Sequence, residues 1–147
     1  MTAMSEMRLS LANRLAFIDR MIYNYLIGNA DAHGKNSSIL YRGKSGKSLA
    51  PIYDVMSTAV YGNLSRVNAM FIGGAKEIDD VTRASFAAMA DEVGMRPSLV
   101  LDRLDRLASK IVPEARSLSE EMASDWPSGI YSEIETIIKA HVATIAC

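Results

Sequence analysis

The chain has 147 residues, of which 49% are hydrophobic, and its 16 basic and 17 acidic residues give a net charge of −1. A chain of this length can bury one compact core, so we expect a single domain over residues 1–147. The nearly neutral balance provides no long-range attraction to polyanions, so we expect neither direct nucleic-acid binding nor membrane association.

The first residues and the last residue of the sequence indicate the cellular compartment of the protein. The single cysteine is Cys147, which excludes an intrachain disulfide and argues against a cysteine metal site. Glu6, Arg8, Asn13 and Arg14 interrupt the first apolar residues, so no signal-peptide core forms, and no later run is long enough to span a bilayer. These features predict a cytoplasmic protein.

The first predicted element is a helix over residues 10–28. Its apolar residues recur every three or four positions: Leu11, Leu15, Ile18, Ile22, Tyr25 and Leu26. Gly28-Asn29 is suited to ending it. Residues 29–36 then lose all hydrophobic periodicity, which predicts a loop. Residues 38–41 and 48–50 are short strand candidates, joined by the charged, glycine-containing turn 42–47.

Helical patterns return in the second half of the chain. Residues 68–74 are expected to be a glycine-containing connection, and a helix carrying Phe86, Met89, Ala90 and Val93 should be capped within 79–82 and end before Gly94. Pro97 opens a further helix, which Pro113 is expected to end or break. A last helix is expected over 132–146. The predicted fold is mainly α with one small β-hairpin.

Three polar side chains carry the chemical signal. Asp31 and Asn36 lie five residues apart in the loop, and Asp54 follows the predicted hairpin. Phosphoryl transfer requires a carboxylate for the attacking hydroxyl, together with an amide oxygen and a second carboxylate for magnesium. The protein-kinase catalytic loop has the same five-residue interval between its aspartate and its metal-binding asparagine. The pattern therefore favours a kinase site.

Two longer motifs, Asn29-Ala-Asp-Ala-His-Gly-Lys-Asn36 and Leu49-Ala-Pro-Ile-Tyr-Asp-Val-Met-Ser57, resemble the HipA-like C-terminal domain, as does Phe71-Ile-Gly-Gly74. The resemblance covers residue 10 to the end and implies a protein-kinase-like C-terminal lobe. It implies that Asp31 is the catalytic base, with Asn36 and Asp54 as Mg²⁺ ligands.

The resemblance also implies an activity and partners. Members of this family transfer phosphate from ATP to serine or threonine, with aminoacyl-tRNA synthetases among their targets. They act as toxins held by a DNA-binding antitoxin, so a HipB-like antitoxin is an expected partner.

Other residues near the motif have two readings each. His33 either orients Asp31 or touches phosphate, or it is a buried histidine satisfied by the backbone. Lys35 either offsets phosphate charge or is a solvated surface lysine. Both are counted with Asn36 and Asp54 as candidate nucleotide-binding residues. Ile52 and Tyr53 are expected to set the angle of Asp54 by packing, and His141 is expected to be structural.

A complete kinase needs a glycine-rich loop and a phosphate-pairing lysine ahead of the catalytic loop. The first glycine is Gly28 and the first lysine is Lys35, so we expect no nucleotide-clamping N-lobe among the residues before Asp31. Gly43-Lys44-Ser45 and Gly46-Lys47-Ser48 lack the earlier glycine of a phosphate loop. The sequence thus predicts weak or no turnover alone, through truncation or because a separate N-lobe polypeptide is required.

Two other functions stay open. A catalytically inactive module could keep the lobe's surface for partner binding. A lipid or small-molecule kinase would fit the shorter string Asp-x-His-x-x-Asn, which inositol-lipid kinases share, although the nearly neutral charge counts against a lipid substrate.

Overall fold

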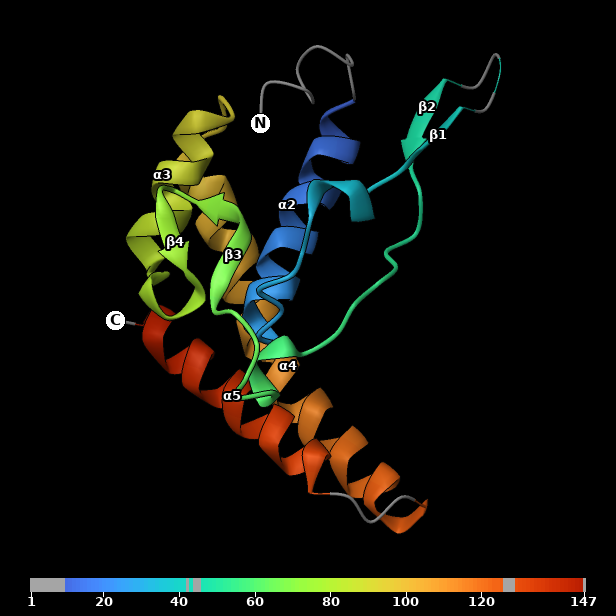
Figure 1. Cartoon of the computed structure of the whole chain (residues 1–147). Coiled ribbons are helices and arrows are strands. Elements are labelled where there is room, and N and C mark those ends of the chain that lie inside the picture. The colour runs from blue at the N-terminus through green and yellow to red at the C-terminus, as the bar shows by residue number, and fades with distance from the viewer. Residues whose placement is uncertain (1–9, 42, 44–45, 126–128, 147) are drawn as a thin grey trace.

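The computed structural model describes residues 10–41, 43, 46–125 and 129–146 (Figure 1). Glu6, Arg8, Cys147 and part of the predicted turn 42–47 lie outside the described residues. The elements are α2 (Leu11–Leu26), η1 (Gly34–Asn36), β1 (Ile39–Tyr41), β2 (Lys47–Leu49), η3 (Thr58–Val60), β3 (Val67–Ile72), β4 (Ala75–Glu77), η4 (Ile78–Asp80), α3 (Arg83–Glu92), α4 (Pro97–Asp125) and α5 (Ile130–Ala146). The mainly helical fold is confirmed, and no helix of the described part could cross a membrane.

Helix α2 is the central element of the fold. The Ser10 side chain caps its N-terminus by accepting from the backbone of Asn13. Gly28 follows its end with φ 76°, and a Cβ there would lie 2.8 Å from both Ala59 Cβ and Ile137 Cγ2. The helix therefore ends at a position where only glycine fits the backbone and the packing.

One face of α2 builds the core together with α3, α4 and α5. The largest fully buried side chains include Ile18, Ile22, Tyr25, Leu26, Phe86, Met89, Val100, Leu104 and Ile145. The Tyr25 ring meets Phe86 edge-on at 5.4 Å between centroids and stacks on His141 at 4.8 Å. Burial of this apolar surface is the main stabilising contribution to the fold.

His141 is structural, as expected. Its ring is 7% exposed, and Nδ1 lies 2.7 Å from the carbonyl oxygen of Tyr25. Because a carbonyl oxygen only accepts, Nδ1 carries the proton and donates it. Burial is the main reason why the pKa of His141 falls below its ordinary value of 6.5.

The described residues form two small antiparallel hairpins, one more than expected. Strand β1 pairs with β2, with Ile39 opposite Leu49 and Tyr41 opposite Lys47, which confirms the first. The expectation of a connection at 68–74 is wrong, because β3 pairs with β4 across a turn at Gly73-Gly74. Irregular alternation of buried and exposed residues along β3 hid this strand from pattern analysis.

The expectation that Pro113 ends its helix is also wrong. Helix α4 runs from Pro97 to Asp125 with Pro113 inside it. Pro113 is exposed, so the helical bond that it cannot make lies on the solvent side of α4. Packing along α5 offsets the cost of about 3 kcal/mol for an internal proline. The last helix begins at Ile130, slightly earlier than expected.

Gly73 should tolerate no side chain. A Cβ at Gly73 would lie 2.0 Å from the Ser85 carbonyl oxygen, whereas one at Gly74 would meet nothing within 4 Å. Both have positive φ, so alanine is strained at either. We expect Gly73→Ala to lower the free energy of unfolding by about 2 to 4 kcal/mol and Gly74→Ala by about 1 kcal/mol in urea titrations. Equal losses of unfolding free energy in the two variants would contradict the close approach of Ser85 in α3 to Gly73.

His141 should make stability depend on pH. Its pKa is lower in the folded protein than in the unfolded chain, so the unfolded state binds the proton more readily. Stability is therefore complete above pH 6.5 and falls as the pH drops below it, by at most about 1.4 kcal/mol per pH unit. Urea unfolding at pH 7, 6 and 5 should show this slope.

His141→Gln should flatten that slope. The lowered pKa of Asp79, caused mainly by its hydrogen bond from Arg66, acts in a separate window below pH 3.8. An unchanged slope in His141→Gln would show that another group titrates between pH 7 and 5.

Candidate functional site

Asn36 and Asp54 meet across the first hairpin. The Asn36 side-chain nitrogen donates to Asp54 Oδ2 at 2.6 Å. Asn36 ends the short η1 turn, and Asp54 has φ 55°, the one described residue other than glycine with positive φ. Strained backbone of this kind costs on the order of 1 kcal/mol and is concentrated at functional sites. The structure thus brings together two of the three residues singled out in the sequence.

Asp31 pairs with His33 instead. His33 Nε2 lies 2.9 Å from Asp31 Oδ1, with the two side chains 43% and 67% exposed. His33 is therefore not buried among backbone partners, and its orienting role stays a prediction. No hydrogen bond among the described residues joins Asp31 to Asn36 or Asp54.

The site opens into two cavities. Asn36 and Asp54 line a cleft of about 20 Å³, together with Arg20, His33 and Tyr53. This holds about one water molecule, far less than the 300 Å³ or more of a usual ligand pocket. A nucleotide would therefore lie mostly outside the cleft.

Asp31 lines the second cavity. It is a groove of about 290 Å³ whose walls include the exposed apolar residues Met56, Leu64 and Val67. His33 lines the first cleft and bonds to Asp31 of the second, so it lies between the two.

Two asparagines fix the start of the loop. Asn29 is 5% exposed, and its side-chain oxygen accepts from the backbone N–H of Asp31 at 3.1 Å. Its side-chain nitrogen donates to Asn24 Oδ1 at 2.8 Å, and Asn24 in turn donates to the Arg20 carbonyl oxygen at 2.9 Å. This chain of bonds attaches the backbone of Asp31 to α2.

Comparison with known proteins gives the family. Residues 1–115 match the family described as the HipA-like C-terminal domain. The chain belongs to this family.

Relatives of this HipA-like domain are kinases by name. Y4mE, a kinase-like protein of Sinorhizobium fredii, is 36% identical over 107 residues, covering 73% of this chain and 25% of that protein. The serine/threonine-protein kinase toxin HipA of Shewanella oneidensis is 35% identical over 94 residues, covering 64% of this chain and 21% of that protein. The chain thus spans about a quarter of the length of these relatives, whose names imply ATP-dependent chemistry in the family generally.

A solved structure supports the same fold. The complex of HipA, HipB and operator DNA from Shewanella oneidensis MR-1 contains a chain that matches with a TM-score of 0.75 and 26% identity. The match covers 88% of this chain and 30% of that chain. The similarity therefore relates this HipA-like domain to one part of that larger chain.

Tyr53 acts through its hydroxyl group in this HipA-like domain. That group lies 2.8 Å from Ser38 Oγ and donates to the Lys35 carbonyl oxygen at 3.1 Å. The sequence predicts that Ile52 and Tyr53 set the angle of Asp54 by packing. They are 41% and 43% exposed, so packing alone does not set this angle. The Lys35 residue is exposed.

Sequence reasoning missed Arg20. This residue donates to the Ala50 carbonyl oxygen, lines the Asn36–Asp54 cleft, and has a buried Nη1 without a hydrogen-bond partner among the described residues. Burial lowers the pKa of the Arg20 guanidinium, and the nearby Tyr53 partly offsets this. A signal existed, because Asn13, Arg20 and Asn24 repeat at helical spacing on one face of α2.

Asn29 should be essential for the loop. Asn29→Ala leaves the Asp31 N–H and the Asn24 side-chain oxygen without their partner, which should lower the free energy of unfolding by about 1 to 3 kcal/mol. The exposed Asn63→Ala is the matched control and should change it by less than about 0.5 kcal/mol. Chemical denaturation measures both, and a small loss for Asn29→Ala would show that the loop is held by other bonds.

Proposed function

We propose that this chain is the catalytic-loop half of a HipA-type serine/threonine protein kinase, which transfers phosphate from ATP to a protein hydroxyl in the cytoplasm. The contact between Asn36 and Asp54 carries the proposal, because two polar residues 18 positions apart meet beside the Asp31 loop. Family membership adds to it, since the relatives are kinases by name.

The residues present fit a magnesium ion. Because Asn36 donates to Asp54 through its nitrogen, its oxygen Oδ1 and the second carboxylate oxygen Oδ1 of Asp54 stay available as ligands. Mg²⁺ is usually held by one or two protein oxygens, with waters and nucleotide phosphates completing the octahedron. The ion would neutralise charge that develops on the phosphates during transfer.

The protein's own groups have separate tasks. Asp31 accepts or orients the proton of the acceptor hydroxyl, and His33 positions the Asp31 carboxylate through its 2.9 Å contact. Asn36 and Asp54 hold the metal, while Lys35 offers a positive charge from the same turn. Arg20 fixes the segment before Asp54 by its bond to Ala50.

The groove at Asp31 is the proposed place of the acceptor. Its apolar wall of Met56, Leu64 and Val67 fits a polypeptide segment with its hydroxyl directed to Asp31. A protein substrate, for example an aminoacyl-tRNA synthetase, follows from the family. A HipB-like antitoxin is a further proposed partner, since the HipA structure that this chain matches is a complex with HipB.

A bound nucleotide would need a second lobe to enclose its phosphates. The cleft of about 20 Å³ cannot enclose a nucleotide, so an N-lobe must cover the phosphates from the other side. We propose that this lobe comes from the longer protein or from a separate polypeptide. Turnover by the 147 residues alone is then weak or absent, because positioning supplies much of the barrier reduction.

Calorimetry with ATP and Mg²⁺ tests the half-site. Asp54→Asn removes one charge, keeps an acceptor for Asn36 and tolerates positive φ, so its stability should stay within about 0.5 kcal/mol of the original. Its affinity for ATP with Mg²⁺ should fall at least tenfold, corresponding to a loss of about 1.4 kcal/mol. The exposed Asp102→Asn on α4 should bind as before.

Equal binding by Asp54→Asn, or binding unaffected by removing Mg²⁺, would contradict the metal role of this carboxylate. No binding of ATP at millimolar concentration would favour the catalytically inactive, partner-binding alternative.

A further inference from the structure

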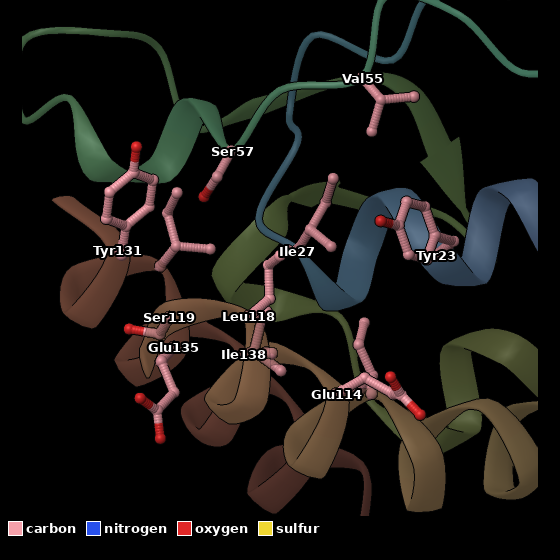
Figure 2. Close-up of a pocket in the computed structure, with 13 residues that line it drawn as sticks. Tyr23, Ile27, Val55, Ser57, Glu114, Leu118, Ser119, Tyr131, Glu135 and Ile138 are labelled. Carbon is pink, nitrogen blue, oxygen red and sulfur yellow. The ribbon is translucent and has the colours of Figure 1, made fainter. Parts of the chain in front are cut away.

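A third concave site lies away from Asp31, between α4, α5 and the segment 55–57 (Figure 2). It has a volume of about 320 Å³, within the range of small-molecule pockets. Ile27, Leu118 and Ile138 are among its apolar lining residues, and Leu118 is 57% exposed. This groove has the size and the apolar character that the cleft at Asn36 and Asp54 lacks.

Ser57 gives the groove a polar group at its inner side. The residue is 7% exposed, and its Oγ is buried with no hydrogen-bond partner among the described residues. Figure 2 shows this side chain directed from the segment 55–57 toward the side of the groove where Tyr131 lies. A buried hydroxyl without a partner is unfavourable, so a ligand that hydrogen-bonds with it gains affinity.

The rim of the groove is acidic. Glu114 lies on α4 and Glu135 on α5, at different sides of the apolar floor (Figure 2). Lys139 pairs with Glu135 at 2.6 Å, whereas Glu114 has no ion-pair partner among the described residues. On α4, Arg116 is bound to Glu120, and Lys110, four residues before Glu114, makes no ion pair with it in the described structure. The free carboxylate of Glu114 therefore selects for a positive charge on the occupant.

We propose that this groove binds a small amphipathic amine, with an aromatic or aliphatic body, a hydrogen-bonding group at Ser57 and an ammonium group at Glu114. The body covers Ile27, Leu118 and Ile138, which removes exposed apolar surface from water. This inference goes beyond the proposed function, and its binding test needs no nucleotide, so the two can fail independently.

The groove is linked to the candidate kinase site through the chain itself. Val55 and Ser57 line the groove, and Asp54, with its positive φ, directly precedes them. An occupant that contacts Val55 and Ser57 restricts the backbone that places Asp54. If the proposed function holds, the amine thereby regulates the metal site.

Tryptamine is the probe, because it combines an indole N–H with an ammonium group. Amide chemical shifts of the labelled protein during titration should change at 55–57, 111–119 and 131–138, with a Kd on the order of millimolar. Indole-3-acetate has a similar body but the opposite charge and should bind at least threefold more weakly. Stronger or equal binding of the acetate would overturn the proposal, as would shifts confined to other segments.

Two variants locate the contacts. Glu114→Gln should weaken tryptamine about threefold, the size expected of an exposed charge pair, whereas Asp102→Asn, at an exposed position of α4 outside the groove, should not. Ser57→Ala should weaken tryptamine about fivefold but leave 2-(1-naphthyl)ethylamine, which lacks the N–H, unchanged. The same variant should unfold at an equal or higher temperature, because it removes an unpartnered buried hydroxyl.

Loss of stability in Ser57→Ala together with equal weakening of both amines would assign Ser57 a purely structural role and overturn the proposal. Shifts at the groove that grow with protein concentration in the absence of any probe would also overturn it, because a second copy of the chain would then be the occupant.

Discussion

The hydroxyl group of Thr58 joins the two segments that carry the candidate catalytic residues. Thr58 is 4% exposed, donates to the Gly28 carbonyl oxygen at 3.1 Å, and accepts from the Ala30 N–H at 2.9 Å. The backbone N–H of Ala59 also donates to Gly28, at 2.9 Å. Three hydrogen bonds thus hold the chain after Asp54 against the chain before Asp31, and a buried polar network of this kind specifies one arrangement.

This arrangement depends on the two different faces of α2. The apolar face buries Ile18, Ile22 and Tyr25 in the core, which fixes the helix relative to α4 and α5. The polar face holds the site, since Arg20 bonds to Ala50 and Asn24 reaches Asn29. The core therefore places the site indirectly, because any rotation of α2 would move both ends of the catalytic loop at once.

Sequence patterns predicted the elements whose periodicity is regular. The helix over 10–28, the first hairpin and the last helix were found because apolar spacing and glycines agree there. The second hairpin was missed because β3 has no clean alternation, and the length of α4 was missed because a local rule about Pro113 ignores the packing of α5 along it. In both cases tertiary contacts outweigh the local preference.

The candidate site was predictable as a set of residues apart from Arg20, and its geometry was not. Spacing alone brought out Asp31, Asn36 and Asp54, but it gave no means to see that Asn36 contacts Asp54 while Asp31 contacts His33. The pairing depends on the strained backbone at Asp54 and on Tyr53, whose hydroxyl reaches the Lys35 carbonyl across the hairpin. Such a strained residue persists only where its surroundings over-determine it. The bonds from Tyr53, Thr58 and Arg20 on either side of Asp54 meet that condition, and so the same contacts that order the loop also maintain the strain.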